Sequence, residues 1–206
     1  MTPTNLKITF FACAATLLAI AIILLYAGRG VEAANVLRDP SAQFGIPLHA
    51  GFVSWLGVFC LVAAAAATGL GAGLAGRGSA VLATASGLSL LLAFDDAFMF
   101  HERVWVRSTG LGETVIFAAY AAGMAALLAL LRHARPAIGM AGLHLALACL
   151  AFSLLFDTVR PGFVSYRLGQ TIEDVAKFAG FAAWLGYWFA ASRSYIVSAR
   201  RPSTRV

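Results

Sequence analysis

The chain has 206 residues, of which 61% are hydrophobic and only 12% are charged. This composition excludes an ordinary soluble globular domain, because such a chain must be solvated mainly by lipid. The net charge of +6 could suggest nucleic acid as a partner, but the basic residues lie in short loops and a tail beside apolar segments, where anionic lipid headgroups are the nearer partner. We therefore expect an integral membrane protein that contacts membrane lipids and no nucleic acid.

Six apolar runs follow one another along the chain, and each is long enough to cross the hydrocarbon core of a bilayer as a helix, which takes about 20 residues. The runs cover residues 8–27, 49–75, 79–100, 113–131, 138–158 and 171–192. The first run is longer than the apolar core of about 7–15 residues found in a signal peptide, so we expect it to remain as a helix. The sequence thus predicts an all-α bundle of six transmembrane helices over residues 1–192 and a basic cytoplasmic tail over residues 193–206.

Two patterns concern the packing of these helices. Gly69, Gly71 and Gly73 give the second run small side chains that allow a neighbouring helix to approach closely. Trp184 and Trp188, near the end of the last run, indicate an aromatic belt at the membrane interface and helix packing.

The acidic residues all fall at one end of the predicted bundle. They are Glu32, Asp39, Asp95, Asp96, Glu102, Glu113, Asp157, Glu173 and Asp174. The opposite end has no acid and carries Lys7, Arg77, Arg132, Arg135, Arg193, Arg200, Arg201 and Arg205. Basic residues occur at both ends, but the turns at the purely basic end are tight. The positive-inside rule then predicts cytoplasmic termini and a periplasm-facing acidic end in a bacterial inner membrane.

Two adjacent carboxylates, Asp95 and Asp96, lie about one turn before the third run leaves the apolar region. A charged group within a membrane segment is rare unless it is paired or faces a polar interior, so such residues are usually functional. If the helix continues through residue 102, Asp95 shares a face with Glu102. On the same assumption His101 points about 100° away from that face, and Asp96 shares a face with Arg103.

Carboxylates and imidazole gathered at one rim favour a divalent cation, since they supply oxygen and nitrogen ligands. The predicted metal ligands are Asp95, His101, Glu102, Asp157 and Glu173. The predicted catalytic residues are Asp96, His101 and Glu102. We expect the metal to polarise a carbonyl or phosphoryl oxygen and to activate water, acting on a lipid-like, amphiphilic substrate that enters from the outer leaflet.

Two alternatives stay open on the same residues. In the first, the chain is a transporter or channel whose acids relay protons or attract cations. In the second, it is a structural or partner-binding subunit without enzymatic activity, and its acids form an ion-pair belt with Arg103, Arg160 and Lys177. Glu173 and other acids in predicted first turns also suit the helix dipole, which is a structural role.

Overall fold

A computed structural model of the chain describes residues 13, 16–18, 20–32, 44–47, 49–159 and 165–200. Within these ranges, the side chains that are not described are those of Arg77, Glu102, Asp157, Thr158, Val159, Tyr166 and Arg167. The chain divides into two compact units, Met1–Ala50 and Gly51–Val206. Every regular element of the described part is helical, which confirms the all-α prediction there.

The Met1–Ala50 unit contains the apolar helix Thr16–Ala27. The helix is closed by Gly30, whose φ of 78° is in the left-handed region. The Gly30 N–H donates to the Ala27 carbonyl at 2.9 Å, and the Val31 N–H donates to the Tyr26 carbonyl at 3.1 Å. This pair of bonds is the Schellman arrangement, which requires a residue that tolerates positive φ. The first predicted run ends at the same residue as this helix.

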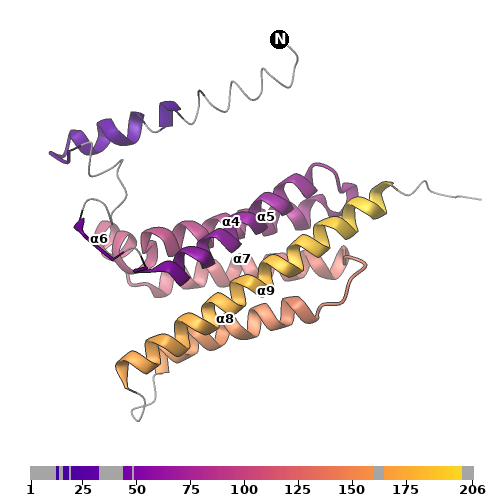
Figure 1. The fold of residues 1–206 in the computed structure, drawn as a ribbon. Coiled ribbons are helices and arrows are strands. Elements are labelled where there is room, and N and C mark those ends of the chain that lie inside the picture. Colours follow the sequence, from indigo (N-terminus) through magenta and orange to yellow (C-terminus); the bar gives the residue numbers. More distant parts are fainter. Residues whose placement is uncertain are drawn as a thin grey trace, which may run out of the picture. The chain divides into compact units, whose positions relative to one another are not determined.

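The Gly51–Val206 unit holds the remaining elements (Figure 1). In chain order they are helix α4 (Phe52–Ala72), the 3-10 turn η1 (Gly76–Gly78), helix α5 (Ser79–Phe98), the π-helical turn η2 (Phe100–Trp105), and helices α6 (Val106–Thr109), α7 (Thr114–His133), α8 (Ala141–Val159) and α9 (Tyr166–Arg200). Helix α4 packs against α5 and α9, α8 packs against α9, and α7 packs against α5.

Three helices of the described part, α4, α5 and α7, are long and apolar enough to cross a membrane. The apolar part of α8, Ala141–Phe156, and the helix Thr16–Ala27 are shorter. Helix α9 has 35 residues but is not one of the three, because charged residues such as Lys177 interrupt its apolar sequence. The finding is compatible with a membrane protein, whereas the bundle of six spans remains a prediction.

The centre of the core is aromatic and belongs to α9. Trp184 and Trp188, one turn apart, are the largest fully buried side chains, and their ring centroids lie 5.5 Å apart in an edge-to-face arrangement. The Trp184 Nε1–H donates to the Ser89 Oγ of α5 at 2.9 Å. The packing role of this pair is thus confirmed, but its predicted place in an interfacial belt is wrong, because α9 packs between α4 and α8 and both rings face the core.

Helices α4, α5 and α9 meet at Gly71. A Cβ atom at this position would lie 2.9 Å from Leu82 Cδ1 and 3.2 Å from Ser192 Cβ, so the predicted close approach is confirmed.

Gly71→Ala is expected to lower the free energy of unfolding by about 1–3 kcal/mol through overpacking. At Gly87 of α5 nothing lies within 4 Å of such an atom, and Gly87→Ala is expected to raise stability by up to about 1 kcal/mol. Denaturant titration of both variants in mild detergent tests this contrast, and equal effects would contradict the packing.

Candidate functional site

The third apolar run does not continue as one straight helix. Helix α5 ends at Phe98, and Met99 has φ 49° and ψ 46°, which is the left-handed region. It is the only residue other than glycine with positive φ in the described part of the chain. Such a conformation costs a residue with a Cβ atom about 1–2 kcal/mol. Six residues of π-helix follow, Phe100–Trp105. The assumption that residues 95 to 102 share one regular helix is therefore wrong.

The reversal at Met99 brings His101 back onto Asp95. The Asp95 Oδ1 accepts the His101 backbone N–H at 2.8 Å, and the Asp95 Oδ2 lies 2.7 Å from the His101 Nδ1. Asp95 is only 6% exposed. The expectation that His101 points away from Asp95 is therefore wrong, because the carboxylate holds both the backbone and the ring of this residue. These two hydrogen bonds offset the free-energy cost of the left-handed backbone conformation of Met99.

Helix α7 supplies an aromatic wall for this pair. The Phe117 ring lies on the His101 ring with centroids 5.1 Å apart, and the Tyr120 ring lies beside Phe117 at 6.5 Å. The buried Tyr120 hydroxyl interacts electrostatically with the Asp95 carboxylate but makes no hydrogen bond of normal geometry within the described residues. Tyr120 was not among the predicted site residues. Its hydroxyl within an otherwise apolar run is the feature of the sequence that indicates such a role.

Asp96 points away from Asp95, because successive residues of a helix lie about 100° apart. Its Oδ1 lies 2.7 Å from the Lys177 Nζ of α9, and its Oδ2 accepts the Ser54 hydroxyl of α4 at 3.4 Å. Lys177 also interacts electrostatically with Asp174 and Glu173 of its own helix. Asp96 thus connects α5 to α9 and α4 at one end of the bundle. Its expected neighbour on η2, Arg103, is exposed and forms no ion pair within the described residues.

The other predicted site residues contribute less to this end. The side chains of Glu102 and Asp157 lie outside the described part, as does the whole of Arg160. Glu173 lies on α9 near Lys177. Among the described residues, no group of three or more His, Cys, Asp or Glu side chains could hold a metal ion. The described residues therefore bring together the Asp95–His101 pair and the Asp96–Lys177 pair, and no complete ligand set.

An apolar groove of about 550 Å³ lies beside α5, lined mainly by residues of α4 and α5 such as Val58, Leu90 and Phe94. No charged side chain lines it. It lies on a different side of α5 from Asp95 and Asp96, which contact η2 and α9. The groove is therefore separate from the polar pairs.

The family described as a domain of unknown function, DUF8692, matches residues 9–191 of the chain. The chain belongs to this family. Both polar pairs lie inside the DUF8692 domain, whereas Arg193 and the residues after it lie outside the matched range. No curated protein and no solved structure matches the chain.

The chemistry available in this DUF8692 domain follows from the Asp95–His101 geometry. A neutral imidazole that donates its Nδ1–H to a carboxylate keeps its lone pair on Nε2, which becomes the basic nitrogen. The carboxylate also stabilises the imidazolium that forms when Nε2 takes up a proton. The aromatic wall and the burial of Asp95 strengthen these interactions by excluding water. The pair is thus suited to accept and return a proton.

Proposed function

We propose that this protein is a bacterial inner-membrane protein of six spans, whose periplasm-facing end carries a general acid–base site built on His101. Three of the spans would be α4, α5 and α7, and the others would be the first apolar run, α8 and residues 171–192 of α9. The termini would be cytoplasmic, in keeping with the basic residues of the tight turns. The single observation that supports the site is the double attachment of His101 to the Asp95 carboxylate.

Each residue has a distinct role in this proposal. His101 Nε2 takes a proton from a substrate hydroxyl or a water molecule, while Asp95 fixes the ring and stabilises its charged form. Phe117 limits access of water to the ring. Asp96, Lys177 and Ser54 do not take part in the proton transfer but hold α5, α9 and α4 together below the site.

The substrate class follows from the position and charge of this end. The site lies at the end of α5, a helix apolar enough to cross a membrane, so an amphiphile in the outer leaflet would reach it with its headgroup. Lys177 pairs with Asp96 and interacts electrostatically with the carboxylates of Glu173 and Asp174, so acids outnumber this cation. A polyanionic headgroup would be repelled there, so we propose a neutral or cationic headgroup that carries a hydroxyl or ester.

A divalent cation bound through His101 is a second candidate, favoured by the same hydrogen bond. Histidines that bind metals usually donate their other ring N–H to a carboxylate. Asp95 would then orient the ligand and would not bind the metal itself. Metal analysis by mass spectrometry, on protein purified without chelator, tests this candidate: stoichiometric metal that is lost in His101→Gln supports it, and metal-free protein contradicts it.

A proton path through the bundle is supported less well. The buried polar side chains of the described part, apart from Asp95, are Thr68, Ser89, Ser153 and Ser192. The hydroxyls of Thr68 and Ser89 donate to carbonyls of their own helices. We therefore prefer chemistry at one end of the bundle to transport across it.

Incubation of the purified protein with a total bacterial lipid extract tests the proposed activity. Wild type is expected to convert at least one lipid species, followed by mass spectrometry, and His101→Gln is expected to lower the rate by at least about 100-fold, as for loss of a general base. The control Glu113→Gln changes an exposed carboxylate at the start of α7 that makes no side-chain capping bond, and it should keep the full rate. No conversion by wild type, with or without added divalent cations, would contradict the proposal.

A further inference from the structure

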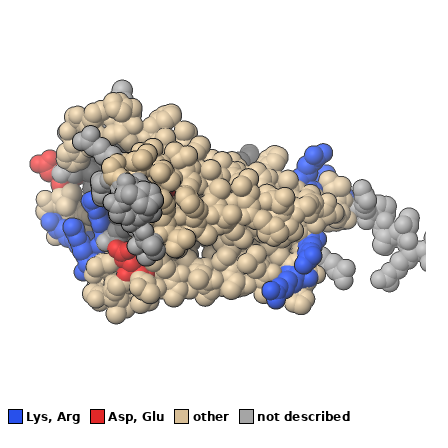
Figure 2. Space-filling model, turned by 90° about the horizontal axis from the view of Figure 1, so that it is seen from below, with Lys and Arg blue, Asp and Glu red and all other residues tan. Residues whose placement is uncertain are grey.

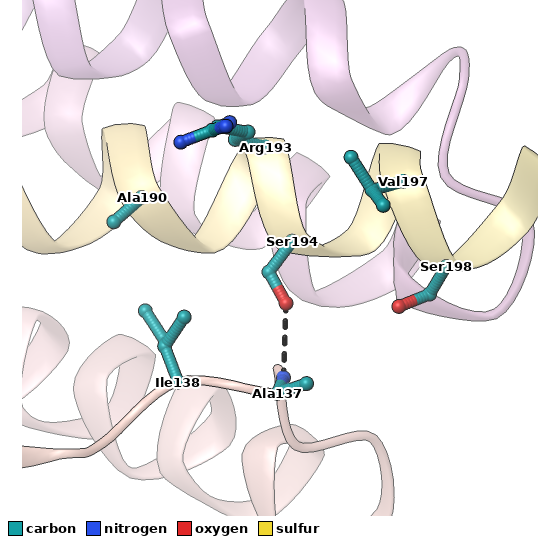
Figure 3. A pocket seen from close by; sticks show the side chains of 7 residues that line it. All are labelled: Ala137, Ile138, Ala190, Arg193, Ser194, Val197 and Ser198. Atoms are coloured by element: carbon teal, nitrogen blue, oxygen red, sulfur yellow. Dashed lines mark hydrogen bonds between the residues drawn. The ribbon is translucent and has the colours of Figure 1, made fainter.

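A small cavity lies at the other end of the Gly51–Val206 unit, far along the helices from His101. Its volume is about 350 Å³. One wall is a single face of α9, and the other is the segment 137–138 that connects α7 to α8 (Figure 3). The lining residues are Ala137, Ile138, Ala190, Arg193, Ser194, Val197 and Ser198. The lining is thus mainly apolar, with one cation and two hydroxyls as its polar groups.

The walls of this cavity are fixed to each other by hydrogen bonds. The Ala137 backbone N–H donates to the Ser194 Oγ at 3.0 Å, which Figure 3 shows as the bridge between the connecting segment and α9. One residue further on, the Tyr195 hydroxyl donates to the Ala134 carbonyl. The Tyr195 ring lies so close to Gly78 that any Cβ atom there would collide with it. The cavity is therefore held open by a rigid frame.

The polar groups of this cavity are available to a ligand. Arg193 is exposed and forms no ion pair with any described residue. The Ser198 hydroxyl makes no hydrogen bond within the described residues, and Ser194 still has its own hydroxyl proton to donate. In Figure 3 both hydroxyls lie on the side of α9 that faces the connecting segment, whereas the Arg193 guanidinium extends along the other side of the helix, so that it reaches a ligand between the walls by turning around α9. Guanidinium and hydroxyl donors together suit phosphate oxygens.

The surrounding charge favours an anion. Figure 2 shows basic side chains and no acidic one at the end of this unit where α9 runs to its C-terminus. Arg132 and Arg135 lie at the end of α7 and in the segment after it, next in the chain to the cavity wall. A phosphate that is free in solution would use only the few polar groups of the cavity, whereas a phospholipid would also place its acyl chain against Ile138 and Val197.

We propose that this cavity binds the headgroup of an anionic phospholipid, with Arg193, Ser194 and Ser198 as donors to its phosphate. The lipid would come from the leaflet at the basic end of the bundle. Basic pockets between helices are common sites for anionic lipid headgroups. The site is independent of His101. Its proposed phosphate donors lie outside the residues matched by the family, whereas Ala137, Ile138 and Ala190 of its walls lie inside them.

The test is a titration of the full chain in neutral detergent with phosphatidylglycerol, with phosphatidylcholine as the neutral probe, read by native mass spectrometry. Wild type is expected to bind phosphatidylglycerol about tenfold more tightly than Arg193→Gln does, the loss of one charge-assisted contact. The control Arg132→Gln removes an exposed cation of the same end that does not line the cavity, and it should bind like wild type. Ser198→Ala is expected to weaken phosphatidylglycerol binding by several-fold.

Three results would overturn the proposal. Equal weakening by Arg193→Gln and Arg132→Gln would mean diffuse attraction to the basic end. Equal binding of phosphatidylglycerol and phosphatidylcholine would mean that the headgroup charge is not recognised. Displacement of the lipid by millimolar inorganic phosphate would mean a phosphate ion site.

If Arg193→Gln does not fold, Arg193→Lys is the variant to use. It keeps the positive charge but loses the planar set of guanidinium N–H donors, so the affinity of Arg193→Lys for phosphatidylglycerol is expected to lie between those of wild type and Ser198→Ala.

Discussion

Replacing Lys177 with methionine is expected to lower the free energy of unfolding by about 2–3 kcal/mol, because Asp96 then keeps a charge without its cation. The Asp96 side chain is 10% exposed and that of Lys177 is 36% exposed. The effect should therefore lie below that of a fully buried pair and above that of a surface pair, which is about 1 kcal/mol or less. Denaturant titration in mild detergent measures it.

A double-mutant cycle separates the ion pair from other effects of the substitution. Lys177→Met combined with Asp96→Asn removes both charges, so the combined loss should be smaller than the sum of the single losses by about 1–3 kcal/mol. Arg103→Met is the matched control, since Arg103 is an exposed cation without a described partner, and its effect should stay within about 0.5 kcal/mol. Additive losses in the cycle would show that the pair does not hold the helices together.

The second large effect is expected at Asp95. Asp95→Ala removes the acceptor of the His101 backbone N–H and the partner of its ring, and each buried group left without a partner costs about 1–3 kcal/mol. The strained Met99 conformation also loses the contacts that hold it. We expect a total loss of about 2–4 kcal/mol, measured by the same titration.

Two further variants show whether that loss arises from the hydrogen bonds. Asp95→Asn keeps an oxygen that can accept the His101 backbone N–H, so its loss should be nearer to about 1 kcal/mol. Glu113→Ala removes an exposed carboxylate from the residue that precedes α7, which makes no side-chain capping bond, and it should change stability little. An Asp95→Ala variant as stable as Glu113→Ala would contradict the structural role of the pair.

Hydropathy was enough to find most of the helices. The predicted runs 49–75, 79–100, 113–131 and 138–158 correspond to α4, α5, α7 and α8, with ends that differ by only a few residues. The reason is physical: a segment of about 20 apolar residues satisfies its own backbone only as a helix. Helix α9 was predicted only in part, because its first and last turns carry charged residues such as Arg167 and Arg200 and therefore lie outside the predicted apolar run 171–192.

The arrangement of the site could not be found from spacing. The left-handed conformation of Met99 has no signal in the sequence, since glycine is the residue expected at such a turn. Without this turn, a regular helix separates Asp95 from His101. The Asp96–Lys177 pair joins residues of α5 and α9, and helix adjacency cannot be deduced from hydropathy. The rarity of acids inside apolar runs did identify Asp95 and Asp96 as the positions to consider.

The state of the His101 ring is the most direct test of the central claim, that Asp95 holds His101 as a proton acceptor. Because the chain has only four histidines, ¹⁵N spectra of protein labelled at its histidine rings can be assigned with His101→Gln. In the neutral form, His101 is expected to carry its proton on Nδ1 with Nε2 unprotonated, and Asp95→Asn should reverse this preference. Protonation of Nε2 in the neutral wild-type ring, unchanged by Asp95→Asn, would contradict the proposed site.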